Sequence, residues 1–540
     1  MASAVAGGGG GGYIRSMPNR FFNVAGPCNP VDHYMLPTAR RLQGIDELVR
    51  QKLFFVIHAA RQSGKTTLAQ ELVRTLTAGT TYHAVYCSLE SVQGVEDAEK
   101  GIPAVIDCLR SATQYPQAFA KTKFAPPGAD LGGFNVQIKN ALTAFCQALD
   151  KPLVVFFDEA DCLSGQTLIN FLRQLRDGYV NRSTIPFVHS LCLIGMRDIR
   201  DYKAQVRNGR TSLGSASPFN IVTESLTLGS FTRDELAELY GQHTADTGQV
   251  FAPEAVAKAF DLTQGQPWLV NALAREVTVK ILGGDLSRRI EPEMIEQAAQ
   301  TIILRRDTHI DSLLERLKEE RVRKIVEPMM LGKEWGFSAL DDDFQYAKDL
   351  GLIRTDGTEV RPANPMYGEV IARTLSLDAQ NSLGADRYHI DPPRYLRSDG
   401  SLDMNLLLGE FQAFWRENSE IWTERFFYRE AAPHLVLMAF LQRVVNGGGR
   451  VLREMATGRM RLDLCAEFNG YRYPVEVKLD YGLKTIPEGL AQLGAYMDKL
   501  GCGAGWLVIF DRDPAKPWDA KVFRREATSP AGKPITIFGC

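Results

Sequence analysis

The feature that most constrains this chain is the run AARQSGKTT at residues 59–67, because it joins an apolar segment to a helical pattern. Residues 53–60 (LFFVIHAA) have the continuous apolar composition of a buried strand, and residues 66–78 repeat apolar positions with the period of a helix. A loop between a strand and a helix can hold phosphate groups with its backbone N–H groups and the positive end of the helix. The sequence therefore predicts a phosphate-binding loop.

The side chains of this loop are of the types that bind a nucleoside triphosphate together with Mg²⁺. Lys65 is expected to reach the β and γ phosphate oxygens, and the hydroxyl of Thr66 is expected to ligate the metal. The predicted nucleotide-binding residues are Arg61, Gln62, Ser63, Gly64, Lys65, Thr66 and Thr67. Ala59 stands where such loops usually have their first glycine, and a GK[ST] triplet alone often arises by chance. The flanking strand and helix favour the functional interpretation, with ATP and Mg²⁺ as the cofactors.

A buried strand is also predicted at residues 153–161 (LVVFFDEAD), and two carboxylates, Asp158 and Glu159, lie near its end. Carboxylates at the C-terminal ends of parallel strands face the crevice where ligands bind. Asp158 is expected to hold Mg²⁺ through water, and Glu159 is expected to polarise the attacking water. The alternative is a strand that simply ends in a solvated acidic turn.

Strands and helices alternate along this part of the chain, which predicts an α/β fold. Further strands are expected at residues 82–90 and 188–196, and helices at 135–149 and 166–179. Continuous apolar strands separated by helices indicate a parallel sheet that is covered on both faces. The last of these strands leads into Arg197, which either senses the γ-phosphate or forms a surface salt bridge.

Length and composition narrow the class of protein. A chain of 540 residues is too long for one hydrophobic core, and a net charge of −2 gives no overall basic excess, so any surface for nucleic acid must be local. The nine cysteines form no CxxC pair or Cys/His cluster, which favours free thiols in a reducing compartment over disulfides or zinc. The sequence shows neither a secretory signal nor an apolar run of about 20 residues. We therefore expect a cytoplasmic protein without a membrane partner.

The pattern of elements divides the chain into successive segments. A flexible glycine-rich leader is expected at residues 1–20, followed by the nucleotide-binding core at 21–230. From 231 to 306 the strands give way to helical patterns, which predict a small helical lid. The remaining segments are a winged-helix-like unit at 307–375, a polar linker at 376–404 and a second α/β domain at 405–540.

The order of these motifs resembles that of the STAND and archaeal-type AAA-like ATPases. The shared features are the phosphate loop, the strand with Asp158 and Glu159, the GMRD strand end and the Gly-Gln-Pro turn that starts a helix. A proline at the start of a helix needs no ligand, but in that family this turn packs beside the adenine, so the resemblance places Pro267 in the nucleotide site. It covers roughly residues 20–375, and it implies an ATPase that acts as a switch rather than as a fast motor.

A second group of candidate residues lies in the C-terminal part of the chain. Asp463 and the pair Glu476 and Lys478 are expected on two strands joined by the Asn469-Gly470 turn, which is typical of a hairpin. Side chains alternate along a strand, so Glu476 and Lys478 point to one face. Carboxylates there can bind Mg²⁺, and a lysine beside them can orient or deprotonate water for attack on a phosphodiester. The alternative is a solvated salt bridge.

This group resembles the PD-(D/E)xK nuclease superfamily, especially its RecB-like branch, over about residues 405–515. The matching residues are Asp463, Glu476 and Lys478 as the catalytic triad, with Glu430 on a preceding helix and Gln492 as auxiliary positions. Leu462 stands where the first proline of the motif name would be. The resemblance implies a restriction-endonuclease-like α/β domain in which Asp463 and Glu476 hold a metal ion.

Together these features predict an ATP-binding and ATP-hydrolysing switch that controls a metal-dependent DNA nuclease. The alternative, from a different class, is a signalling or scaffold ATPase whose nuclease-like domain is inactive and only binds nucleic acid or protein. Metal-dependent cleavage that is lost when Asp463 is replaced by alanine separates the two. The sequence leaves open whether the chain forms a homo-oligomer or binds a protein partner.

Overall fold

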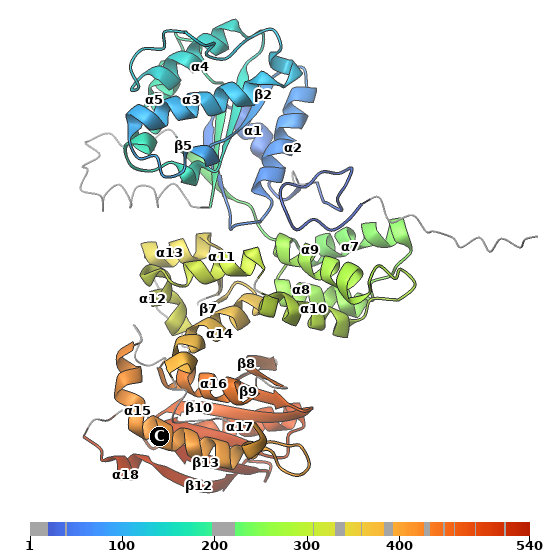
Figure 1. Ribbon diagram of the computed structural model, residues 1–540, viewed down its shortest axis with the longest axis vertical. Coiled ribbons are helices and arrows are strands. Elements are labelled where there is room, and N and C mark those ends of the chain that lie inside the picture. The colour runs from blue at the N-terminus through green and yellow to red at the C-terminus, as the bar shows by residue number, and fades with distance from the viewer. Residues whose placement is uncertain are drawn as a thin grey trace, which may run out of the picture. The chain divides into compact units, whose positions relative to one another are not determined.

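The computed structural model describes most of the chain between residues 20 and 540. The described residues are 20–37, 40–196, 222–305, 307–329, 341–357, 359–382, 392–425, 432–445, 449–457, 460–480, 482–511, 513 and 515–540. Their contacts divide the chain into two compact units, one that ends at Arg305 and one that runs from Arg306 to Cys540 (Figure 1).

A five-stranded parallel sheet forms the centre of the first unit, in the order β2-β3-β4-β1-β5. Its strands are β1 (Phe54–His58), β2 (His83–Ser88), β3 (Leu153–Asp158), β4 (Ser190–Gly195) and β5 (Val222–Thr227). Every residue of β1, β3 and β4 is buried, as expected for apolar strands that are covered on both faces. The predicted α/β fold with a parallel sheet is confirmed in this unit.

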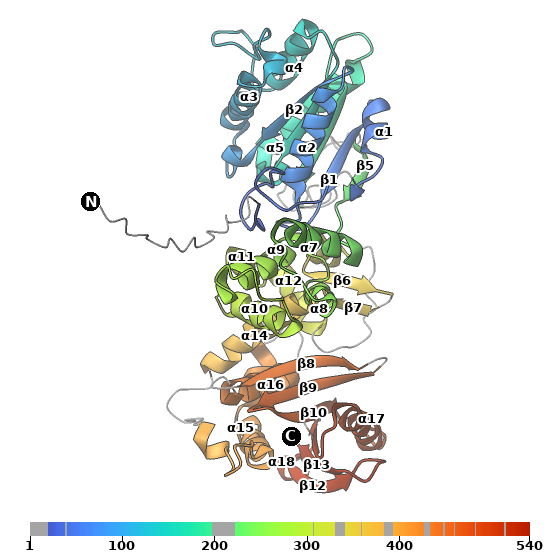
Figure 2. The same ribbon diagram turned by 90° about the vertical axis from the view of Figure 1, so that its right-hand side faces the viewer.

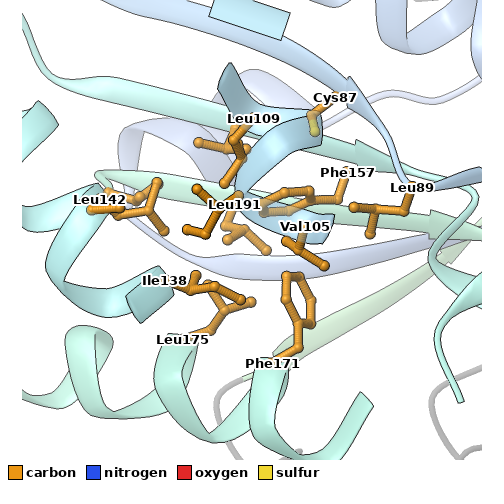
Figure 3. Packing of buried hydrophobic residues seen from close by; sticks show 14 of the residues in the cluster. Cys87, Leu89, Val105, Leu109, Ile138, Leu142, Phe157, Phe171, Leu175 and Leu191 are labelled. Atoms are coloured by element: carbon orange, nitrogen blue, oxygen red, sulfur yellow. The ribbon is translucent and has the colours of Figure 1, made fainter. Parts of the chain in front are cut away.

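Helices cover both faces of this sheet (Figure 1). They are α1 (Ile45–Arg50), α2 (Lys65–Ala78), α3 (Ala98–Gln114), α4 (Gln137–Ala148) and α5 (Gly165–Asn181). The first two pack on one face, against Phe55 and Phe156, and the other three pack on the opposite face. Figure 3 shows this second layer, where Phe157 and Leu191 of the sheet lie among side chains of the helices, including Phe171. The alternation of side chains along each strand thus supplies both layers.

After β5 the first unit continues with helices. They are α7 (Arg233–Thr247), α8 (Pro253–Thr263), α9 (Pro267–Arg275), which continues as a π-helical turn (Glu276–Ile281), and α10 (Pro292–Arg305). A capping box starts α7, because Thr232 and Glu235 each accept a hydrogen bond from the other's backbone N–H.

Residues 20–37 pack against these helices as well as against the sheet domain. The rings of Phe22 and Tyr34 lie 4.8 Å apart, and Phe22 also contacts Tyr240 of α7 at 5.6 Å between ring centroids. Arg20, expected in a flexible leader, instead forms a salt bridge with Asp246 of α7 at 2.9 Å. Phe22 and Tyr34 bury apolar surface against α7, and this packing holds Arg20 close to the helix.

The second unit begins with helices and a small hairpin. The elements are α11 (Thr308–Arg316), α12 (Glu320–Met329), α13 (Asp342–Asp349), β6 (Ile353–Asp356), β7 (Glu359–Pro362) and α14 (Pro365–Ser382). Strands β6 and β7 pair antiparallel. The linker expected from residue 376 starts later than predicted, because α14 continues to Ser382. Leucine, alanine and glutamine in this stretch are good helix formers, and they extend the helix into a segment that looks polar.

A six-stranded mixed sheet follows, in the order β12-β13-β11-β10-β9-β8. Its strands are β8 (Gly449–Thr457), β9 (Met460–Phe468), β10 (Tyr471–Leu479), β11 (Gly505–Phe510), β12 (Phe523–Thr528) and β13 (Pro534–Gly539). The helices are α15 (Met404–Arg425), α16 (Ala432–Val445), α17 (Thr485–Leu500) and α18 (Trp518–Lys521). Helix α17 packs on one face of the sheet, and α15 lies on the other, where Phe411 contacts Phe510 (Figure 2). Within the described parts of the chain, no helix has the length and apolar character needed to cross a bilayer.

Candidate functional site

The predicted phosphate-binding loop connects β1 to α2. Helix α2 begins at Lys65, and Gln62 and Gly64 have positive φ angles of 57° and 94°. Glycine adopts this conformation without strain, whereas at Gln62 it is the kind of backbone strain that functional loops contain. The first N–H groups of a helix lack partners within it and point out of its N-terminus. The loop therefore has the form that binds a phosphate group.

Lys65 is buried at the base of this loop. Its ammonium group donates hydrogen bonds to the carbonyl oxygens of Ala59 and Ala60, at 2.8 and 2.9 Å. Burial lowers the pKa of Lys65, and nearby carboxylates, Glu159 first, oppose this effect. The hydrogen bonds of this buried cation go to neutral carbonyl groups, so an anionic phosphate would gain a strong charge-assisted interaction here.

Asp158 joins the loop to the end of β3. Its Oδ2 atom accepts hydrogen bonds from the hydroxyl groups of Thr66 at 2.7 Å and Tyr86 at 2.9 Å, and its Oδ1 atom accepts one from the N–H of Glu159 at 2.9 Å. The structure thus brings together Thr66 and Asp158, the two residues predicted around Mg²⁺. Their oxygen atoms fit this ion, which prefers oxygen ligands and retains several waters. Tyr86 is not among the predicted residues, because nothing in its strand pattern marks its hydroxyl.

Glu159 follows β3 directly, in the left-handed backbone conformation with φ 54°. Burial raises the pKa of Glu159, the charge of Asp158 raises it further, and Lys65 opposes the shift. A raised pKa makes a carboxylate a better proton acceptor near neutral pH. This environment is compatible with the predicted role of Glu159 in polarising water.

The end of β4 lies between the ends of β1 and β3, which carry the phosphate-binding loop and Asp158, because β4 separates these two strands in the sheet. Asp161 accepts a hydrogen bond from the N–H of Met196 and fills the space beside Gly195, where a β-carbon would lie 2.7 Å from its carboxylate. These contacts fix the backbone at the end of the strand. Arg197 follows at once but lies outside the described residues, so its role stays a prediction.

The turn before α9 lies against the loop. Gln266 caps α9 by accepting a hydrogen bond from the N–H of Leu269 at 2.6 Å. Its amide group also lies 3.5 Å from the carbonyl oxygens of both Arg61 and Gln62, within donor distance. Pro267 is buried at the first position of α9. The structure therefore places Pro267 next to a residue that touches the loop, and its contact with a base stays a prediction.

Two further contacts with the loop involve residues that no motif marks. Both terminal nitrogens of Arg41 donate to the carbonyl oxygen of Ser63 at 3.1 Å. The N–H of Cys28 donates to the hydroxyl of Thr67 at 2.9 Å. The hydroxyl of this predicted nucleotide-binding residue therefore has a hydrogen-bond partner within the chain. Of these two residues, Cys28 has no sequence signal for a contact with the loop. Arg41 has a weak one, because it is a basic residue that precedes the first strand.

The second candidate group lies in the six-stranded sheet. Asp463 is on β9, and Glu476 and Lys478 are on β10, across the predicted Asn469-Gly470 turn. Antiparallel pairing brings Asp463 beside Glu476, and Asp463 Oδ2 accepts a hydrogen bond from the N–H of Val477 at 2.9 Å. The predicted hairpin is therefore present, and it brings the two carboxylates together.

The carboxylate of Glu476 is fully buried, with 0% exposure. Lys478 Nζ lies 2.8 Å from Oε1 as an ion pair, but neither oxygen makes a hydrogen bond of normal geometry with a described residue. Burial raises the pKa of Glu476 to about 8, the charge of Asp463 adds to the shift, and Lys478 opposes it. Such a group is costly to bury unless further positive charge compensates it.

Lys478 links this carboxylate to α17. Its ammonium group donates a hydrogen bond to Gln492 Oε1 at 2.9 Å. Burial lowers the pKa of Lys478, but the charges of Glu476 and Asp463 outweigh this effect, so the pKa is raised. The predicted auxiliary residue Gln492 therefore lies in the site, whereas Glu430 lies outside the described residues.

The donor set of this second group is small. Among the described residues, no three His, Cys, Asp or Glu side chains are grouped so as to hold a metal ion. Asp463 and Glu476 provide two carboxylates, and Mg²⁺ binds in many proteins through one or two carboxylates together with water and phosphate oxygens. The buried, incompletely compensated oxygens of Glu476 fit such an ion.

The family model described as AAA domain matches residues 49–202. A Walker-type ATPase of Pyrococcus abyssi is similar at 14% identity and a TM-score of 0.46, over 65% of this chain and 99% of that chain. Cdc6p from Pyrobaculum aerophilum is similar at 14% identity and a TM-score of 0.36, over 64% of this chain and 95% of that chain. No curated protein matches the chain significantly.

The RuvB Holliday junction branch migration motor of Thermotoga maritima is also similar, at 15% identity and a TM-score of 0.31, over 60% of this chain and 89% of that chain. These distant structural likenesses say nothing about what the present chain binds. The family match, by contrast, covers the phosphate-binding loop and the Thr66–Asp158 contact. Residues 49–202 of this chain therefore form an AAA-type P-loop ATPase domain.

Proposed function

We propose that the chain is an ATP-hydrolysing switch of the STAND type, whose nucleotide state controls a metal-dependent DNA nuclease in the second unit. The ATPase part is supported by the domain at residues 49–202. We assign residues 307–375 to a winged-helix-like unit, and the domain at 405–540 to the PD-(D/E)xK class with a restriction-endonuclease-like fold. The arrangement of α17 on the parallel strands β10 and β11, with both carboxylates beside it, supports this assignment.

The observation that carries the nuclease proposal is the burial of Glu476 beside Asp463. Two carboxylates share this site, and Lys478 is the cation that pairs with one of them. A buried carboxylate that must keep its proton to about pH 8 is a poor structural element, because a neutral apolar residue would pack there at lower cost. The charge of a bound divalent cation would offset the cost of burying both carboxylates, and metal binding would explain why they are buried.

The residues of this site have separate roles in the proposed hydrolysis. Asp463 and Glu476 would hold Mg²⁺, which when bound supplies a Lewis acid for the phosphate and for water. Lys478 is positioned by Gln492 at 2.9 Å, and its ammonium group orients the attacking water and stabilises negative charge on the phosphate. Because these groups act on the phosphodiester itself, they give no preference for a base sequence. We propose DNA as the substrate.

The nucleotide site has groups that suit ATP hydrolysis. Lys65 and the loop N–H groups would bind the phosphates, while Thr66 and Asp158 would hold the Mg²⁺ that accompanies ATP. Glu159, with its raised pKa, would polarise the attacking water. The contact of Gln266 with the loop gives the helices α7–α10 a direct means to respond to the bound nucleotide.

Cleavage of DNA by the purified full chain tests the nuclease. Linear, supercoiled and single-stranded DNA would be incubated with Mg²⁺ or Mn²⁺, with and without ATP, beside the variants Asp463→Ala and Asp463→Asn. A matched control is Glu467→Gln on the same strand, whose carboxylate pairs with Arg472 at 2.9 Å. We expect metal-dependent cleavage that both Asp463 variants abolish and that the control retains. If the protein cuts DNA under none of these conditions, the proposed nuclease activity is wrong.

The Lys478–Glu476 ion pair also supports the alternative, a signalling or scaffold ATPase with an inactive nuclease-like domain. This pair at 2.8 Å places a cation beside the buried carboxylate of Glu476 without a metal, as a purely structural site would. In that case the chain would bind DNA or a protein partner equally well with chelator and with Mg²⁺, and it would cut nothing.

A further inference from the structure

Arg41 joins the phosphate-binding loop to the connector at residues 228–232, which leads from β5 to α7. Both of its terminal nitrogens donate to the carbonyl oxygen of Ser63 at 3.1 Å, and one also donates to the carbonyl oxygen of Gly229. The guanidinium group lies over the ring of Phe231, 4.7 Å from its centroid. One side chain therefore holds the loop and the connector together.

The contact with Ser63 controls a peptide plane that is needed for phosphate binding. A trans peptide is planar, so its C=O and the following N–H point in opposite directions. A donor on the Ser63 carbonyl therefore fixes the direction of the Gly64 N–H, at a glycine whose φ is 94°. Without that donor, glycine has other accessible conformations in which this N–H would turn away from a phosphate.

The connector is in turn bonded to the elements on either side of it. The N–H of Leu228 donates to the carbonyl of His58 at the end of β1, at 3.1 Å. The N–H of Phe231 donates to the carbonyl of Gly265, in the turn before α9, at 2.8 Å. Arg41 thus links the Ser63–Gly64 peptide to a segment that leads into α7 and is hydrogen-bonded to the turn before α9.

The charge of Arg41 is not used in an ion pair with any residue that the structure describes, and its hydrogen bonds go to neutral carbonyl groups. Burial lowers the pKa of Arg41 to about 10, and Glu235 opposes the shift. Arginine suits this position because its planar group donates to two acceptors and stacks on a ring at the same time, which lysine cannot do.

We infer that Arg41 is a positioning residue that sets the phosphate-binding loop for the nucleotide and links occupancy of the loop to the connector of the helices α7–α10. The inference rests on the proposed ATP switch. The hydrogen bonds of Arg41 go to the carbonyl groups of Ser63 and Gly229, so it acts through these two residues.

The variants Arg41→Gln and Arg41→Lys test this role in the full chain. Arg40→Gln is the matched control, because Arg40 carries the same charge one residue away and its side chain forms an exposed 3.4 Å pair with Glu238. ATP and ADP binding would be measured by calorimetry with Mg²⁺. Amide hydrogen exchange of residues 228–232 would be followed with and without saturating ATP, and Tm would be measured without nucleotide.

We expect Arg41→Gln to weaken ATP binding by about tenfold or more, as the loss of charge-assisted hydrogen bonds predicts. Arg41→Lys should recover only part of this, and Arg40→Gln should stay within about twofold of the wild type. Saturating ATP should slow exchange in the connector of the wild type and of Arg40→Gln but not of Arg41→Gln. A purely structural residue would lower Tm and leave this response to ATP unchanged.

Wild-type affinity and a normal exchange response in Arg41→Gln would overturn the inference. If ATP binds but does not change amide exchange of the connector in the wild type or in any variant, the link to the connector is wrong. The ATP site itself would stand. If the wild type itself binds no ATP, the proposed switch fails, and the inference fails with it.

Discussion

The hydroxyl of Thr66 donates a 2.7 Å hydrogen bond to Asp158 Oδ2, across 92 positions of the sequence. The hydroxyl of Tyr86 reaches the same oxygen at 2.9 Å from the neighbouring strand β2. Asp158 is therefore held from the loop side and from the sheet side. Such support keeps a carboxylate in place for a metal ion and strengthens its binding without adding a ligand.

Tyr86→Phe should therefore lower the affinity of the ATPase domain for the Mg²⁺ that accompanies ATP. The variant removes one hydrogen bond to an ionised acceptor, which is worth about 1 to 2 kcal/mol, so the Mg²⁺ concentration for half-maximal ATPase activity should rise about five- to thirtyfold. The rate at saturating Mg²⁺ should change less. Tyr82→Phe is the control, because this ring packs beside His189 instead. An unchanged Mg²⁺ requirement in Tyr86→Phe would show that Thr66 and the N–H of Glu159 position Asp158 without Tyr86.

Lys65→Ala should separate the two proposed activities. The variant removes the buried cation of the loop, so ATP binding should be lost while the carboxylates of the second unit stay in place. We expect DNA cleavage to persist and its dependence on ATP to disappear. Lys100→Ala, an exposed position on α3, should keep the ATP effect. The coupling would be contradicted if ATP does not change the cleavage rate of the wild type and if Lys65→Ala cleaves DNA at the same rate.

The second site predicts a characteristic dependence of stability on pH. The pKa of Glu476 is raised from 4.5 to about 8 by burial and by Asp463. Between these values the folded chain keeps a proton that the unfolded chain has lost, so the metal-free free energy of unfolding should fall as pH rises through this window. Metal binding needs the deprotonated carboxylate, so the stabilisation by Mg²⁺ should grow toward pH 8.

Thermal unfolding with chelator and with Mg²⁺, from pH 5 to about pH 8.5, measures both trends. Glu476→Gln should flatten the metal-free trend and abolish the stabilisation by Mg²⁺, whereas Glu467→Gln should keep both. Asp463→Asn removes a charge that raises the pKa of Glu476, so it should shift the metal-free fall to lower pH. Identical pH profiles for the wild type and Glu476→Gln would show that this carboxylate does not titrate as proposed.

The parts of the fold and site that the sequence predicts are those built from local pattern. The run at residues 59–67 predicts the loop between β1 and α2, and the run at 153–161 predicts Asp158 at the end of β3. The Asn469-Gly470 turn predicts the hairpin that brings Asp463 beside Glu476. In each case neighbouring residues determine the geometry, either through turn conformation or through the alternation of side chains.

The parts that the sequence does not predict depend on packing between distant segments. Helix α3 has no counterpart among the predicted elements, because Gly101 and Pro103 weaken its helical pattern. The glycine is there for tertiary reasons, since a β-carbon at Gly101 would lie 2.1 Å from the hydroxyl oxygen of Thr167 on α5. Arg41 and Tyr86 escape prediction for the same reason: their partners are known only once the chain is folded.

Gly265 offers a test of how closely the turn before α9 must approach the connector. A β-carbon there would lie 1.9 Å from the carbonyl oxygen of Phe231, and the residue has φ 73°. Gly265→Ala should therefore cost at least about 2 kcal/mol of stability, from backbone strain and from separation of the two segments. It should also weaken ATP binding, because Gln266 would be displaced from the loop.

Gly284→Ala isolates the strain, because Gly284 has φ 81° but open space around it. This control should cost about 1 kcal/mol and leave ATP binding unchanged. Chemical denaturation gives both free energies, and calorimetry gives the affinities. If the two variants lose the same stability and both bind ATP normally, then close contact between Phe231 and Gly265 is not required. In that case the connector would communicate with the loop through Arg41 without the turn.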